Sequence, residues 1–341
     1  MMVGRVAVSE SPAERFTVRA GEMHGQQVIV LSDLVGESQA QIVPGLGFAC
    51  VAFRVSTNSG EWQVLAEPPD AESLIQRTSR YGIPIMYPWP NRIRDGRFTF
   101  EGKTYEMPLA PNGPHAIHGV TRGRAWTVNQ TETDTNGAFC RASIVIGTDA
   151  DDVWPFPSQI SIEYRLKGRE LTVIAEAANL GETAMPMGFG THPWFGMPLG
   201  EGGSKETLEV RAPARAFWEL DETLCTTGAI KPVSEGFDAR DWHAIGDTFI
   251  DDVYTDLPLV DGWFTAEIRD PASGRRVAVR SDAAFREHVV FAPRHGQAVC
   301  LEPYTCTTDA FNLDNRGLDA GTIVLEAGGT WRGVSVIEAF A

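Results

Sequence analysis

A histidine flanked by glycine, proline and aromatic residues stands out in residues 188–195, which read Gly-Phe-Gly-Thr-His-Pro-Trp-Phe. An imidazole can donate or accept a proton near neutral pH, so His192 is a candidate acid or base. The rings of Trp194 and Phe195 could pack against the apolar C–H faces of a sugar. Alternatively, both rings belong to the core and His192 caps them; the segment by itself favours neither interpretation.

Two further loops carry polar groups suited to binding. Asn91 and Arg92 follow Pro88-Trp89-Pro90, whose two prolines stiffen the approach. An asparagine amide both donates and accepts hydrogen bonds, and a guanidinium donates in a fixed fork without losing its charge. His118 precedes Gly119, and a glycine at a strand edge allows close approach of a ligand. Spacing alone favours an ordinary surface turn for Asn91 and Arg92 and a structural role for His118.

Carboxylates occur in two apolar contexts. Glu302 follows Val299-Cys300-Leu301, which predicts a strand that carries the carboxylate to its end. A buried carboxylate is costly unless it is paired or functional, and an ion pair with an arginine is the ordinary alternative. Asp251 and Asp252 could add a carboxylate, although adjacent aspartates are also common in solvated turns.

Signals for metals and cofactors are missing from the sequence. His115 and His118 lie three residues apart among proline and glycine, with no carboxylate or third histidine nearby, which predicts loop hydrogen bonding rather than zinc binding. The phosphate-binding loop, the dinucleotide fingerprint and the Gly-x-Ser-x-Gly elbow are absent. We therefore expect chemistry by side chains alone, with no metal and no cofactor.

The charge balance limits the class of partner. The 341 residues include 45 acidic and 29 basic ones, a formal net charge of −16. Such a surface repels nucleic acid and anionic membranes and leaves low-charge carbohydrates as the natural small-molecule partners, although a local basic pocket remains compatible with it. The scattered, odd set of five cysteines and the lack of a long apolar run, including at residues 1–7, predict a cytoplasmic protein with reduced thiols.

Short alternation broken by turn residues predicts antiparallel strands to position these loops. The predicted strand pairs are residues 98–100 with 105–107, 158–166 with 170–178, and 264–269 with 276–280, and residues 330–339 form a last strand. One helix is expected over residues 71–80, with Asp70 as its N-cap. The absence of helices between strands disfavours a parallel α/β fold. We predict an all-β protein, a large antiparallel β-sandwich, with one domain over residues 1–341.

Taken together, the order and separation of these motifs resemble the aldose 1-epimerase (galactose mutarotase) family over most of the chain. The motifs that carry the resemblance are Asn91-Arg92-Ile93, the hairpin 97–105, Ile117-His118-Gly119, Asn179-Leu180, Met185-Pro186, Thr191-His192-Pro193-Trp194-Phe195, Asp251-x-x-Tyr254, Leu301-Glu302 and Asp309-Ala310-Phe311-Asn312.

The resemblance implies a β supersandwich that interconverts the α and β anomers of a free aldose without metal or cofactor. By motif position, it implies that Glu302 is the general base and His192 the general acid. Asn91, Arg92, His118 and Asp251 would bind substrate, with Asp252 as the alternative to Asp251. Trp194 is expected to contact the sugar, and Trp89 could do so. We expect a monomer or a homodimer.

Departures from the family pattern lie beside the implied sugar contacts and concern substrate identity. Pro88-Trp89-Pro90 replaces a Gly-Arg pair, Pro303-Tyr304 replaces a Thr-Gln-like pair, and His-Pro-Trp-Phe-Gly replaces His-Pro-Tyr-Phe-Asn.

Three alternatives to the free-aldose mutarotase stay open. The first is a hexose-phosphate mutarotase, which would need a cationic pocket. The second is a non-catalytic carbohydrate-binding protein, and the third is a glycosidase using Asp251 and Glu302.

Overall fold

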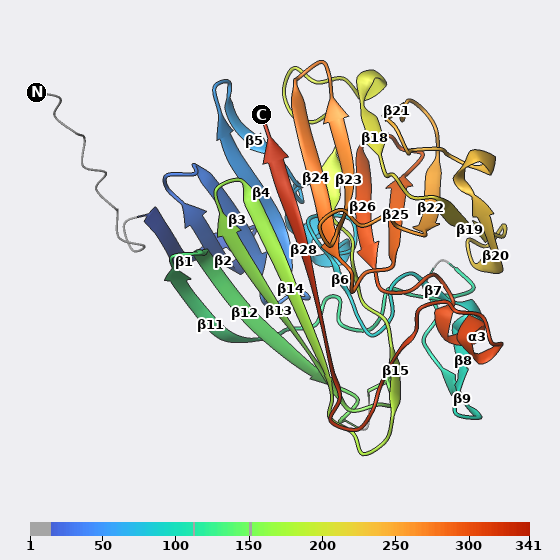
Figure 1. Ribbon diagram of the computed structural model, residues 1–341. Helices are drawn as coiled ribbons and strands as arrows, with labels where there is room; N and C mark the ends of the chain where they lie inside the picture. Colours follow the sequence, from blue (N-terminus) through green and yellow to red (C-terminus); the bar gives the residue numbers. More distant parts are fainter. Residues whose placement is uncertain (1–14, 112, 150–151) are drawn as a thin grey trace, which may run out of the picture.

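The computed structural model describes residues 15–111, 113–149 and 152–341, and antiparallel strands make up about half of it (Figure 1). Residues 1–7, on which part of the expected localisation rested, lie outside the described residues. The first sheet, blue in Figure 1, consists of five strands in chain order: β1 (Phe16–Met23), β2 (Gln26–Asp33), β3 (Ser38–Val43), β4 (Ala49–Thr57) and β5 (Gly60–Gln63).

A nine-stranded sheet packs against this first sheet through β1–β3, which contact strands near its edge. Its spatial order is β11 (Thr127–Asp134), β12 (Gly137–Ile146), β13 (Ser158–Lys167), β14 (Glu170–Asn179), β28 (Thr330–Phe340), β24 (Arg275–Asp282), β23 (Trp263–Asp270), β18 (Glu209–Arg211) and β21 (His243–Ala244).

Period-two alternation explains the large hydrophobic core between these sheets. Along β13, the side chains of Ile160, Ile162, Tyr164 and Leu166 are fully buried, as the sequence pattern predicted. Phe48 directly precedes β4 of the first sheet, and the centroid of its ring lies 5.4 Å from that of Tyr164. The all-β fold with packed antiparallel sheets is therefore confirmed, whereas the single domain over residues 1–341 stays a prediction.

An eight-stranded sheet carries the loops of interest. Its order is β20 (Thr226–Pro232), β19 (Ala216–Leu220), β22 (Ile250–Thr255), β25 (Glu287–Ala292), β26 (Ala298–Tyr304), β16 (Gly190–Thr191) and β6 (Ile85–Met86), with β17 (Trp194–Gly196) also paired to β26. Three two-stranded sheets complete the fold: β7 (Arg92–Ile93) with β10 (Ala116–Ile117), β8 (Arg97–Phe100) with β9 (Lys103–Glu106), and β15 (Met185–Met187) with β27 (Ile323–Leu325).

Helices are few and short: α2 (Ala71–Gln76), α3 (Ala310–Asn315), and the 3₁₀ turns η1 (Arg94–Gly96), η2 (Lys205–Thr207) and η3 (Val233–Glu235). Asp70 caps α2 as predicted, since its carboxylate accepts a hydrogen bond from the Ser73 amide at 2.7 Å. The helix ends at Gln76, however, and not at Arg80. Residues 77–80 leave the helix, and the Ser79 carbonyl accepts a hydrogen bond from Trp194.

The predicted strands and the state of the cysteines agree with the structure. All seven predicted strand segments fall on strands, and the predicted 98–107 hairpin turns at Glu101 and Gly102, both with positive φ. The five cysteines are free and buried. Within the described part of the chain, the structure contains no helix of the length and hydropathy that a membrane span requires.

Candidate active site

The register of the eight-stranded sheet gathers functional side chains on one face. Asp251 on β22 lies opposite Phe291, Phe291 lies opposite Cys300, and Cys300 lies opposite Trp194. Residues directly opposite each other in a sheet project from the same face, as do residues two apart on one strand. Asp251, Cys300 and Trp194 therefore share a face with Glu302.

The same register separates the two adjacent aspartates. Asp252 projects from the opposite face, and Asp251 is the one that lines the cavity described below. Burial and the neighbouring Asp251 charge raise the pKa of Asp252 to about 6. The alternation along β22 thus places Asp251, and not Asp252, beside the other candidate residues.

The loop residues reach this face through the small β7–β10 ladder. The His118 amide donates to the Asn91 carbonyl at 2.7 Å, and Arg92 Nη1 donates to Asn91 Oδ1 at 2.9 Å. Asn91 and His118 have φ values of 52° and 61°, a sparsely populated region for residues other than glycine. Gly119 has to be glycine, because a Cβ there would lie 2.1 Å from the Tyr87 carbonyl oxygen.

A cavity of about 240 Å³ lies where these elements meet. It brings together every residue that the sequence singled out as catalytic or substrate-binding: Asn91, Arg92, His118, Asp251, His192, Trp194 and Glu302. The remaining lining residues are Ser79, Arg80, Ile117, Arg122, Val289, Phe291 and Tyr304. Segments separated by more than two hundred residues of sequence thus form one site.

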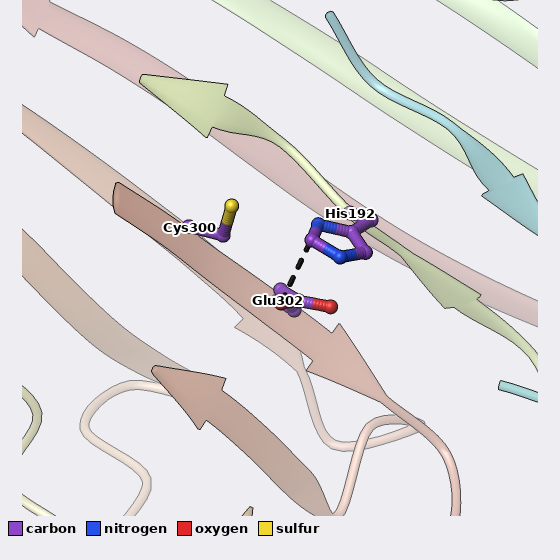
Figure 2. A group of neighbouring side chains, drawn as sticks. All are labelled: His192, Cys300 and Glu302. Carbon is purple, nitrogen blue, oxygen red and sulfur yellow. Dashed lines mark ion pairs between the residues drawn. The ribbon is translucent and has the colours of Figure 1, made fainter. Parts of the chain in front are cut away.

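His192 and Glu302 form the centre of the site (Figure 2). Nδ1 of His192 lies 3.4 Å from Oε1 of Glu302, and both side chains are almost fully buried. The other carboxylate oxygen, Oε2, accepts a hydrogen bond of 2.6 Å from the Tyr304 hydroxyl. Nε2 of His192 has no hydrogen-bond partner among the described residues. The pair therefore combines a fixed carboxylate with an imidazole nitrogen free to meet a ligand.

Burial pushes both members of the pair toward their neutral forms. Desolvation raises the pKa of Glu302 well above its usual range, although the Tyr304 hydrogen bond and the Arg92 charge act in the opposite direction. Desolvation, followed by the charges of Arg122 and Arg92, lowers the pKa of His192 to about 3. An adjacent carboxyl group and imidazole are a suitable arrangement for paired acid and base catalysis.

The two tryptophans differ in their positions. Trp194 lines the cavity, but its ring stacks on the His192 imidazole, with centroids 4.9 Å apart and planes 6° from parallel. Its Nε1 donates to the Ser79 carbonyl at 2.9 Å. Trp89 instead packs in the core, 5.8 Å from Trp154, so its suggested contact with the sugar is wrong.

Sequence reasoning missed several groups at this site. Cys300 lies beside the central pair, and its Sγ, a His192 nitrogen and a Glu302 oxygen all lie within 4.8 Å of one another (Figure 2). Thiolate, imidazole and carboxylate are a ligand set that suits Zn²⁺. Alternation over residues 299–302 places Cys300 and Glu302 on one face, but nothing local joins them to His192.

The predicted hydrogen-bonding role of His115 is confirmed, because its Nδ1 accepts from the Asp95 amide at 3.0 Å.

Comparisons with known proteins identify the relatives of this chain. The model of the aldose 1-epimerase family matches residues 39–338. Mouse galactose mutarotase is 28% identical over 291 residues, covering 81% of this chain and 78% of the mouse protein. The uncharacterized protein YihR of Escherichia coli K12 is 27% identical over 248 residues, covering 72% of this chain and 74% of that protein.

Solved structures share the same fold. A galactose mutarotase-like protein from Clostridium acetobutylicum superposes with a TM-score of 0.86 at 23% identity, covering 96% of this chain and 99% of that one. A galactose 1-epimerase from Lactobacillus acidophilus superposes with a TM-score of 0.75 at 16% identity, covering 95% and 98%. With the family model matching most of its length, this chain belongs to the aldose 1-epimerase family and is an isomerase.

Proposed function

We propose that this protein is an aldose 1-epimerase that interconverts the α and β anomers of a free aldose, with Glu302 as the base and His192 as the acid. The observation that carries the proposal is the 3.4 Å separation of His192 Nδ1 and Glu302 Oε1 at the wall of a small cavity. Mutarotation acts on two oxygens bonded to one carbon, so its acid and base must lie side by side.

In the first step, the Glu302 carboxylate removes the proton from the anomeric hydroxyl while His192 protonates the ring oxygen. The bond between the anomeric carbon and the ring oxygen breaks, and an open-chain aldehyde forms. After rotation about the adjacent C–C bond, the aldehyde closes on its other face and both protons return. Concerted transfer avoids separated charge, and each group can contribute about 10²–10⁴-fold.

This cycle uses the ionised form of the pair, a carboxylate beside an imidazolium. The Tyr304 hydroxyl and the Arg92 guanidinium favour the carboxylate. Sugar hydroxyls donating to Glu302 and a ring oxygen accepting from His192 Nε2 would favour the ionised form further. Asn91, Arg92, His118 and Asp251 supply donors and acceptors that would hold the ring hydroxyls in register.

The test is anomer exchange measured by polarimetry on freshly dissolved α-aldoses, with wild-type protein and with Glu302→Gln and His192→Asn. Each variant should lower the catalysed rate by at least ~10²-fold with a smaller effect on sugar affinity. Two buried residues of β25 outside the cavity lining provide matched controls, Glu287→Gln and His288→Asn, and should leave the rate within a few-fold.

Two outcomes would contradict the proposal. A wild-type protein that binds sugars without accelerating exchange would be a carbohydrate-binding protein on this scaffold. Full activity in Glu302→Gln would remove the assigned base.

A further inference from the structure

Three arginines line the cavity without forming an ion pair to any carboxylate in the described part of the chain: Arg80, Arg92 and Arg122. This is unusual for a protein with a net charge of −16. Nearby arginines outside the cavity are paired: Arg94 lies 2.8 Å from Asp221, and Arg124 lies 3.0 Å from Asp152. The cavity therefore gathers three guanidiniums that form no ion pair with a described carboxylate, within an acidic molecule.

Arg122 is held in a fixed orientation. Its Nε donates to the His118 carbonyl at 3.2 Å and its Nη2 to the Ile117 carbonyl at 3.1 Å. Nη1 has no acceptor among the described residues. Burial lowers the pKa of Arg122 from its usual value, yet an arginine keeps its charge in proteins. A partly buried cation with one free nitrogen at a cavity wall is costly unless a ligand supplies the counter-charge.

Neither carboxylate of the cavity, Asp251 or Glu302, forms an ion pair with Arg122 or Arg80. Burial raises the pKa of Asp251 and, more strongly, that of Glu302. Arg92 is directed toward Asn91, whose Oδ1 it contacts. Arg80 is exposed and follows α2, where it contributes to the cavity lining. Because Arg92 is assigned to the ring hydroxyls in the proposed function, Arg122 and Arg80 are the two guanidiniums left for a further ligand group.

We propose that the aldose accepted by this site carries an anionic substituent, a carboxylate or a phosphate, which Arg122 binds from the cavity wall and Arg80 assists from the exposed side. The proposal rests on the mutarotase chemistry proposed above and names its substrate class; a phosphorylated substrate would replace the free aldose named there. A guanidinium offers paired donors that match both groups, and hydrogen bonds between charged partners are the strong ones.

Binding of such a group would also assist the chemistry. The charge of Arg122 is one of the factors that lower the pKa of His192. An anion beside Arg122 would offset that charge and favour the imidazolium that protonates the ring oxygen. An acidic aldose would therefore gain in turnover as well as in binding, whereas a neutral hexose would leave the guanidinium uncompensated.

The test compares kcat/KM for anomer exchange, measured by NMR, across five sugars: D-glucose, D-galactose, D-glucuronate, D-galacturonate and D-glucose 6-phosphate. At least one acidic sugar should exceed its neutral parent by ~10-fold or more. Arg122→Gln should lower the acidic-to-neutral ratio by about 10–100-fold, and Arg80→Gln should lower it less. Arg124→Gln is the matched control and should leave the ratio unchanged, since Arg124 is paired outside the cavity.

The results separate failure of this inference from failure of the proposed function. Exchange of neutral hexoses with kcat/KM equal to or above that of every acidic sugar would overturn the inference and keep the function. The acidic sugar that responds distinguishes a carboxylate from a phosphate. If no sugar is exchanged, the function fails. Titration calorimetry with the same sugars then decides the inference: tighter binding of an acidic sugar, weakened by Arg80→Gln, supports it, and equal affinities overturn it.

Discussion

The hydrogen bond between Tyr304 and Glu302 offers a sharp test of how the base is tuned. Tyr304 Oη lies 2.6 Å from Glu302 Oε2, and both residues are only 1% exposed. Tyr304→Phe removes the donor while keeping the ring. The hydroxyl stabilises the carboxylate, so its loss raises the pKa of Glu302 further. Because the base acts as a carboxylate, the acid limb of the pH–rate profile should move to higher pH.

The size of the effect follows from the bond that is lost. A hydrogen bond to a charged group contributes about 1.5–3 kcal/mol, and about 1.4 kcal/mol corresponds to a factor of ten. On the acid limb, the ionised fraction of Glu302, and with it the rate, should therefore fall by about 10–100-fold at a given pH.

The assay is polarimetric anomerisation over a series of pH values, with Tyr254→Phe as the matched control. Tyr254 is also buried in the eight-stranded sheet, but its hydroxyl donates to the Phe237 carbonyl at 2.6 Å. The control should lose about 1 kcal/mol of stability and keep the position of its acid limb. An acid limb that is the same in Tyr304→Phe and wild type would refute the reasoning.

Three further predictions concern the same sheet. Zn²⁺ should inhibit exchange through the Cys300 cluster, and Cys300→Ser should weaken the inhibition by at least ~10-fold; equal inhibition of both proteins would rule out the thiolate ligand. Asp251→Asn should weaken sugar binding in calorimetry more than Asp252→Asn, and the reverse order would contradict the register. Burial raises the pKa of Glu287 to about 8, whereas an unfolded glutamate titrates near ~4.3. Between these two pH values the Glu287 carboxyl is protonated in the folded state and ionised in the unfolded state, so the stability of the protein falls as pH rises from one value to the other. Glu287→Gln should therefore flatten the fall in melting temperature between about pH 5 and pH 8. The same slope of melting temperature against pH in the variant and the wild type would contradict this.

Local sequence patterns were sufficient to predict the strands in which apolar residues alternate with polar ones and are buried in the fold. The apolar face of β13 and the hairpin β8–β9 follow from side-chain spacing and turn residues within ten positions. The burial of Glu302 followed in the same way from the apolar run before it. These features depend on neighbours in sequence, so the sequence contains them directly.

Features set by contacts between residues far apart in the sequence could not be predicted from local patterns. The choice between Asp251 and Asp252 is made by pairing with Phe291 and Val290, about forty residues away. The early end of α2 reflects the contact of Ser79 with Trp194. In the sequence Arg122 has no feature that distinguishes it from other loop arginines. In the fold, the backbone carbonyls of Ile117 and His118 accept its hydrogen bonds and hold it at the cavity.

Cooperation between His192 and Glu302 is the central claim, and a double-mutant cycle on the anomerisation rate tests it most directly. Rates are measured by polarimetry for wild type, Glu302→Gln, His192→Asn and the double variant, with circular dichroism confirming that each is folded. Partners that act in one concerted step should make the double variant lose far less than the product of the two single losses. Losses that simply multiply, or a single variant with wild-type rate, would contradict the account.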